Sequence, residues 1–228
     1  MVPTWRRWLV GIFSLALVAA LLTGLIVLLR HEPAYYRRGY LPPSPQRSQL
    51  SAEFYRQIST VLSMLSDPEP DQSWQLRLRQ DQINSYLAEG FVEAQLHREL
   101  PEGVHEPRVA LEQDLIRMGF RYGRDPWQIV ITLDLRLWIN PKEPNAVILQ
   151  VRQLRIGAIP VPVRYVQELL GHALRRRSIE VVWYRYQGLP VAVIRFQSSR
   201  RAPTFHFTSL RIEPGEFVLQ GRTVAPGN

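Results

Sequence analysis

Residues 147–177 constrain the fold more than any other stretch, because the hydrophobic pattern changes there from that of a strand to that of a helix. The first part alternates in the way that a pleated strand requires. At Gln153 the alternation slips by one position. One extra residue reverses every later side chain, so the slip predicts a β-bulge or a crossing of the sheet edge. The residues on the first face are Val147, Leu149 and Val151, and those after the slip are Leu154 and Ile156.

The second part of this stretch predicts a proline corner followed by an amphipathic helix. Gly157, Pro160 and Pro162 interrupt the strand, since proline cannot donate a hydrogen bond to a ladder. Apolar residues then recur at helical spacing up to the arginines at 175–177, which suit the negative end of a helix. The apolar face consists of Val163, Val166, Leu169, Leu170, Ala173 and Leu174.

This segment resembles the corresponding one in the YpmS-like family, small bacterial proteins with one N-terminal membrane anchor. The residues that carry the resemblance are Leu154, Ile156, Gly157, Ile159, Pro160, Val161, Pro162 and Val163. Weaker similarities lie at 82–87 and 212–216, and the pattern is also similar to TULIP-like lipid-binding domains, in which a sheet wraps around a long helix. The resemblance covers about residues 74–220. It implies a fold and a compartment, and it assigns no catalytic residue.

Residues 8–29 carry no charge and are flanked by arginines, which predicts a transmembrane helix. A cleaved signal peptide would have a shorter apolar region followed by a small-residue cleavage site. The pattern therefore favours an uncleaved anchor in the plasma (inner) membrane. Arginines on both sides leave the positive-inside rule close to a tie. The bulk of the chain follows this helix, and this favours a cytoplasmic N-terminus with the main domain extracytoplasmic.

The sequence predicts three regions: an anchor at 1–30, a proline-rich spacer at 31–49 and one α+β domain at 50–228. Tyr35, Tyr36 and Tyr40 are placed where aromatic side chains prefer the membrane interface. Residues 41–48 predict an extended, semi-rigid linker. Together these features predict a domain that is held away from the bilayer.

Within the domain, apolar periodicity predicts helices at 50–65 and 81–96 and short antiparallel strands elsewhere. Gly90 inside the second helix indicates that another group packs closely against it. The predicted strands span 74–79, 108–112, 115–122, 127–139, 147–156, 179–186, 191–196, 204–212 and 217–224. The fold class is therefore α+β, with a curved antiparallel sheet around one or two amphipathic helices.

Patterns typical of catalysis, metal binding or nucleic-acid binding are missing from the sequence. The net charge is +8, but the arginines are scattered rather than gathered on one face with aromatic residues between them, so we expect no nucleic-acid partner. The chain has no cysteine, and its five histidines lack metal-binding spacing. Asp134 is more simply explained by pairing with Arg136 than by acid–base chemistry. We expect a protein that is not an enzyme and has neither metal nor cofactor.

The remaining hypothesis is a non-catalytic module that binds a lipid or other amphiphile in a groove between helix and sheet. The alternative is a solidly packed interaction or assembly subunit with an envelope protein partner. Periodicity cannot separate the two, since a filled core and a lipid groove need the same apolar residues. The residues predicted to line the groove are Ile83, Leu87, Phe91, Val166, Leu170 and Leu174.

Overall fold

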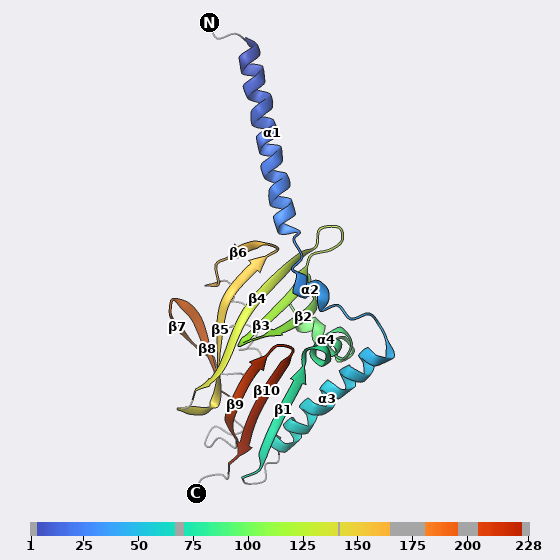
Figure 1. The fold of residues 1–228 in the computed structure, drawn as a ribbon, viewed down its shortest axis with the longest axis vertical. Coiled ribbons are helices and arrows are strands. Elements are labelled where there is room, and N and C mark those ends of the chain that lie inside the picture. Colours follow the sequence, from blue (N-terminus) through green and yellow to red (C-terminus); the bar gives the residue numbers. More distant parts are fainter. Residues whose placement is uncertain (1–3, 67–70, 141, 165–180, 196–204, 225–228) are drawn as a thin grey trace.

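The computed structural model describes residues 4–66, 71–140, 142–164, 181–195 and 205–224, and the fold is α+β (Figure 1). The helices are α1 (Thr4–Leu29), α2 (Ala34–Arg38), α3 (Pro45–Ser66), α4 (Gln80–Ala88), α5 (Gly90–Glu93) and the 3₁₀ helix η1 (Leu96–Glu99). The strands are β1 (Ser73–Arg79), β2 (Val104–Glu112), β3 (Leu115–Tyr122), β4 (Ile129–Asn140), β5 (Glu143–Ile156), β6 (Ile159–Val161), β7 (Val181–Tyr186), β8 (Leu189–Arg195), β9 (Phe205–Glu213) and β10 (Glu216–Thr223).

The strands form two antiparallel sheets. The large sheet has the order β2-β3-β4-β5-β8-β7, and the small sheet has the order β1-β10-β9. The predicted strands agree closely with these elements. The bulge predicted near Gln153 is also present: Asp134 pairs with Gln153 and Leu135 pairs with Val151, so Arg152 is the extra residue.

The proline corner differs from its prediction. Gly157 and Ala158 form a tight turn, and β6 then runs back along β5 with Pro160 opposite Arg155. Pairing therefore continues past the first proline, because β6 lies at an edge where proline needs no ladder partner. Apart from Val163 and Arg164, the helix predicted from 163 onward lies outside the described residues.

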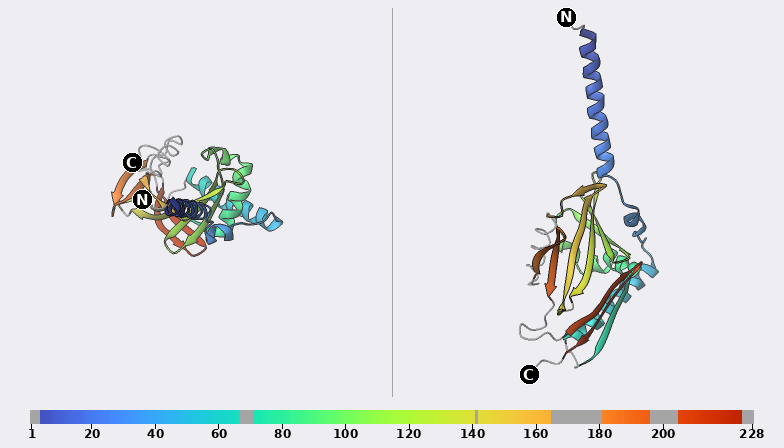
Figure 2. Two further views of the ribbon diagram at one scale, coloured as in Figure 1. Left: turned by 90° about the horizontal axis from the view of Figure 1, so that it is seen from above. Right: turned by 60° about the vertical axis from the view of Figure 1, so that its left-hand side comes forward.

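Helix α1 is long and apolar enough to cross a membrane, and no part of its apolar stretch is buried in the fold. It extends from one end of the body, beside β6 and the loop between β3 and β4 (Figure 1). The small sheet and the C-terminal half of α3 lie at the opposite end, as both side views show (Figures 1 and 2). The body thus has an end near α1 and an end far from it.

The core at the end far from α1 is shared by α3 and both sheets. The side chains of β1 alternate strictly, and Trp74, Leu76 and Leu78 are buried. They pack with Val61 of α3 and with residues of β4, β5 and β9. Helix α3 begins at residue 45, earlier than predicted, because proline is well suited to the first turn of a helix.

Helix α4 covers the outer edge of the large sheet. Asn84 donates to the Val109 carbonyl at 2.9 Å and accepts from the Val109 N–H at 2.8 Å, while Gln80 accepts from the Leu111 N–H at 2.8 Å. The helix predicted at 81–96 breaks after Ala88. As predicted, space at Gly90 is tight, since a Cβ there would lie 2.7 Å from the Tyr86 ring.

Helix α2 covers part of one face of the large sheet, at β3 and β4. Tyr36 is fully buried there, so its predicted position at a membrane interface is wrong. A Cβ at Gly119 would meet the Tyr36 ring, and Thr132, paired with Gly119, is buried as well. The missing side chain at Gly119 makes room for the tyrosine.

Candidate functional site

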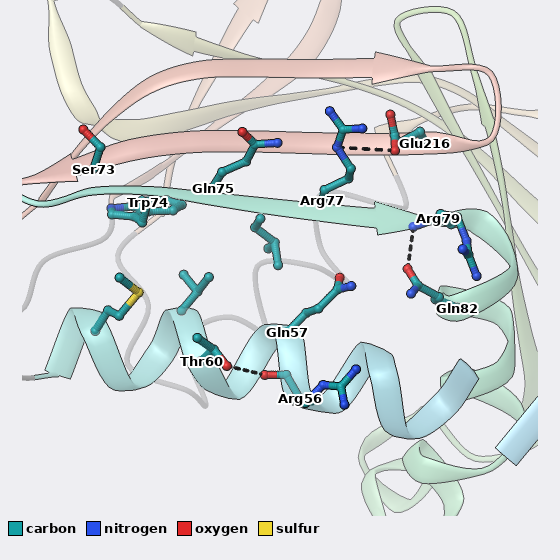
Figure 3. A pocket seen from close by; sticks show the side chains of 13 residues that line it. Arg56, Gln57, Thr60, Ser73, Trp74, Gln75, Arg77, Arg79, Gln82 and Glu216 are labelled. Atoms are coloured by element: carbon teal, nitrogen blue, oxygen red, sulfur yellow. Dashed lines mark hydrogen bonds and ion pairs between the residues drawn. The ribbon is translucent and has the colours of Figure 1, made fainter. Parts of the chain in front are cut away.

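A groove of about 760 Å³ runs between α3 and the free edge of β1 (Figure 3). Most of its lining residues come from these two elements, which a single short loop joins in the chain. Its volume lies within the range typical of small-molecule sites. The lining residues are Arg56, Gln57, Thr60, Val61, Met64, Ser73, Trp74, Gln75, Leu76, Arg77, Arg79, Gln82 and Glu216.

The floor of the groove is apolar. Trp74 and Leu76 point from alternate positions of β1 toward α3, where Val61 and Met64 lie one helical turn or less apart. Trp74 also packs edge-on against Phe207, with ring centroids 6.0 Å apart, which fixes the indole ring. The floor is thus a rigid apolar surface that can bind a hydrocarbon chain.

The rim carries arginines toward the end of β1 that is remote from Trp74 (Figure 3). Arg77 pairs with Glu216 at 3.6 Å, and Arg79 pairs with Asp81 at 3.1 Å. Arg56 has no carboxylate partner among the described residues. The groove therefore combines an apolar end with a cationic end.

Two buried polar atoms in the groove have no hydrogen-bond partner in the described chain. They are Oε1 of Gln57 and Nε1 of Trp74, whose residue is only 5% exposed. A buried polar group without a partner costs about 1–3 kcal/mol. Three further atoms of this kind, in Ser85, Arg117 and Arg121, lie outside the groove.

The free edge of β1 adds backbone groups to the groove. The N–H of Thr223 donates to Gln72 and the N–H of Gln80 donates to Gly215, which fixes the hydrogen-bonding phase of this strand. By alternation, Ser73, Gln75 and Arg77 direct their N–H and C=O groups away from β10. The outer edge of β2 is covered by α4, whereas that of β1 faces the groove.

A second polar cluster joins α2 to the large sheet. Arg108, 9% exposed, donates to the Tyr36 carbonyl at 3.0 Å and to Glu106 at 2.7 Å, and its guanidinium lies 4.3 Å from the centroid of the Tyr36 ring. The Tyr36 hydroxyl donates to the Glu106 carbonyl at 2.7 Å. Arg121 lies 3.4 Å from Glu32. This set of contacts attaches the chain that follows α1 firmly to the body.

Burial shifts the titration of the tyrosines in this cluster. It raises the pKa of Tyr36 to about 12, because the neutral phenol avoids the cost of desolvating a charge; Arg108 opposes the shift and Glu106 adds to it. Burial also raises the pKa of Tyr35, and the nearby Asp134 carboxylate raises it further. Both hydroxyls are therefore protonated hydrogen-bond donors at neutral pH.

The turn between β5 and β6 contacts the end of α1 directly. The N–H of Ala158 donates to the Leu28 carbonyl at 2.8 Å, and the N–H of Gly157 donates to Val130 at 2.7 Å. Gly157 has φ +58, and a Cβ there would clash with the carbonyls of Leu28 and Leu29. The turn at Gly157 and Ala158 thus binds the terminus of α1, where carbonyls lack helical partners.

The predicted groove residues do not come together as a set in the described chain. Ile83 and Leu87 of α4 pack on the core cluster of Val109, Leu111 and Ile212. Phe91 is partly buried on α5. Val166, Leu170 and Leu174 lie outside the described residues, so the predicted space between the two sets stays a prediction.

The other residues singled out in the sequence have structural positions. Leu154 is buried with Leu135 and Val151, and Val161 and Val163 pack against that cluster. Asp134 pairs with Arg117 of β3 at 3.6 Å, and not with Arg136, because Arg117 is its direct cross-strand neighbour. Within the described residues, no group of three or more His, Asp or Glu side chains is arranged to hold a metal ion.

Comparisons with known protein families, with curated proteins and with solved structures found no significant match for this chain. The function must therefore be argued from the groove itself. Sequence reasoning missed this groove, although it predicted both α3 and β1. The available signal was the polar pair Gln57 and Thr60 on the otherwise apolar side of α3, beside Val61.

Proposed function

We propose that this chain is a non-catalytic, membrane-anchored module that binds an anionic amphiphile in the groove between α3 and β1. The observation that carries the proposal is the groove's composition: an apolar floor, an arginine rim and two buried polar atoms without partners. A hydrocarbon chain would lie over the floor beside Met64, since Trp74 and Leu76 are themselves buried. An anionic head group would lie near Arg56.

The energetics favour an amphiphile over a purely apolar or purely ionic ligand. Covering the apolar floor gains about 25 cal/mol per Å² of apolar surface removed from water. Nε1 of Trp74 and Oε1 of Gln57 are covered by protein atoms, so a polar group of the ligand would bond to them only if these side chains shift. Arginine is well suited to carboxylate and phosphate groups because its guanidinium offers a planar set of donors.

The proposal also includes the membrane location and orientation of the module. Helix α1 serves as a single-pass anchor in the plasma membrane, with the N-terminus cytoplasmic and the body in the cell envelope. The TULIP-like arrangement implied by the sequence resemblance also belongs to this proposal, with α3 as the helix beside the sheet. A topology reporter fused after Asn228 is expected to be active outside the cytoplasm; activity inside it would reverse the orientation.

A direct test uses 11-(dansylamino)undecanoic acid, a fluorescent anionic amphiphile, with the purified full-length chain in detergent. In the variant Thr60→Trp, a bulky ring enters the groove from an exposed position of α3. It is expected to weaken binding at least about tenfold, equal to about 1.4 kcal/mol. Ser63→Trp is the matched control, because Ser63 is exposed on α3 and does not line the groove.

The charge of the head group provides the second arm. Replacing the carboxylate of the probe by an alcohol, or Arg56 by Gln, is expected to weaken binding by a similar factor. If the probe binds equally well to wild type and Thr60→Trp, the groove is not the amphiphile site and the proposal is wrong.

The free edge of β1 favours one alternative, an interaction module that adds an extended peptide of a protein partner to the small sheet. The backbone groups of Ser73, Gln75 and Arg77 face the groove, and strand addition uses such an edge. Gln75→Pro separates the candidates, since it removes an edge N–H but no bond to β10. Peptides selected from a displayed library would lose binding in this variant, whereas the amphiphile would keep it.

A further inference from the structure

A second surface lies at the end of the body beside α1. Two loops flank the end of this helix: the β3–β4 loop at 123–128 and the β5–β6 turn at 157–158 (Figure 1). The Arg30 guanidinium donates to the Pro126 carbonyl at 2.9 Å, and the N–H of Ala158 donates to Leu28. Both loops are thus hydrogen-bonded to the residues where the apolar helix ends.

The first loop presents an aromatic side chain that the fold leaves uncovered. Trp127 is 70% exposed, although tryptophan is usually buried, and it directly follows the Pro126 that Arg30 holds. The backbone N–H of Trp127 donates to the Arg124 carbonyl at 2.7 Å, so the loop forms a compact turn. Arg30 and Arg124 supply two positive charges here; Asp125 supplies one carboxylate, and Glu32, which pairs with Arg121 at 3.4 Å, supplies another.

The position of the loop follows from the length of the helix. Residues 8–29 would span about 33 Å at 1.5 Å per residue, close to the ~30 Å hydrocarbon core. The chain therefore leaves the hydrocarbon near Leu29. The head-group layer beyond it is about 5–8 Å thick on each side. A loop bonded to Arg30 lies at that depth, where tryptophan and arginine are favoured.

We propose that Trp127, Arg30, Arg124 and the Ala158 turn form a second, peripheral membrane contact that binds anionic phospholipid head groups. This surface would hold the body upright on the bilayer, with the α3–β1 groove directed away from it. The inference rests on the anchor role proposed for α1 but is independent of any ligand in the groove.

The test takes advantage of the absence of cysteine from the chain. Single variants Leu22→Cys, Trp127→Cys and Tyr184→Cys in the full chain are labelled with a nitrobenzoxadiazole dye. Each is reconstituted in phosphatidylcholine–phosphatidylglycerol vesicles that carry a nitroxide either on the head group or deep in the acyl chain. Tyr184 is the matched control, an exposed aromatic residue on β7.

The label at 127 is expected to be quenched at least about threefold more by the head-group nitroxide than the label at 184. The label at 22 is expected to be quenched most by the deep nitroxide. If 127 and 184 respond alike while 22 is quenched, the peripheral contact is refuted and the anchor stands. If the label at residue 22 is not quenched by the deep nitroxide, both the membrane-anchor role of α1 and the peripheral contact are refuted.

Discussion

The two ends of the body differ in their polar contacts, although each holds buried polar atoms without a hydrogen-bond partner in the described chain: Nε of Arg117 and of Arg121 in the α2 cluster, and one atom each of Gln57 and Trp74 at the groove. Near α1, Arg108 contacts Tyr36 and Glu106 at once, and the backbone of Ala158 binds the terminal carbonyl of Leu28. The end near α1 is thus attached to the chain that follows the helix through several side-chain and backbone contacts, whereas the groove is where we propose that a ligand binds.

The difference also has a geometric consequence. The C-terminal half of α3 and the small sheet, whose residues line most of the groove, lie at the end of the body remote from α1 (Figures 1 and 2). If α1 is the membrane anchor that we propose, an amphiphile bound in the groove would be held away from the bilayer. Firm attachment of α2 to the large sheet would keep that separation constant, since the chain after α1 cannot swing as a free linker would.

The firm attachment of α2 to the large sheet is tested most strongly by substituting Tyr36, whose ring is fully buried. Tyr36→Ala is expected to lower the free energy of unfolding by about 3–5 kcal/mol, because it leaves a cavity under α2. Tyr36→Phe keeps the ring and loses one hydrogen bond, so about 1 kcal/mol is expected. Urea unfolding in detergent measures both. Tyr40→Ala, at an exposed position, is the control; an equal loss there would contradict a special role for Tyr36.

The same residue makes stability depend on alkaline pH. Its folded pKa of about 12 exceeds the ordinary value of 10. The stabilisation is therefore complete below pH 10 and is lost as pH rises through 12, by roughly 2–3 kcal/mol. Urea midpoints between pH 8 and 12 should fall in wild type and fall less in Tyr36→Phe. Identical profiles would show that Tyr36 does not titrate in this range.

The turn at the end of α1 is probed by two glycines that share a left-handed backbone. Gly157 has φ +58 and faces α1, while Gly188 has φ +77 and open space around it. Gly188→Ala is expected to cost about 1 kcal/mol for its backbone alone. Gly157→Ala should cost about 2 kcal/mol, since its methyl group also meets the helix carbonyls. Equal thermal shifts would mean that the turn does not rest on α1.

The smallest effect on stability is expected in the groove. Gln57→Met removes an amide oxygen that has no partner, so the unfolding free energy should stay within about 0.5 kcal/mol of wild type or rise. Gln82→Met is the control: this buried glutamine bonds Glu53 and the Arg79 N–H, and about 1–3 kcal/mol should be lost. Amphiphile binding should weaken in Gln57→Met. A large loss of stability there would assign Gln57 a structural partner.

Much of the secondary structure could be predicted from the sequence, because alternation and helical spacing are local consequences of one buried face. The β2–β3 hairpin, the long strands and the slip beside Arg152 all follow from patterns within a few residues. The close packing at Gly90 could be predicted because glycine is unfavourable inside a helix and its presence there indicates a close neighbour. Helix lengths were less predictable. The predicted helix breaks after Ala88, and the space around Gly90 there is limited in part by Ser51 of another helix.

The positions of the sites were decided by the tertiary structure. Apolar periodicity is identical for a residue in a core and for one in a groove, so Ile83 and Leu87 could not be told from Val61 and Trp74 by pattern alone. Tyr36 is buried because Gly119, far along the chain, leaves space for its ring. Gly157 meets α1 for a similar reason. Such contacts join residues distant in sequence, and only the folded chain brings their surfaces together.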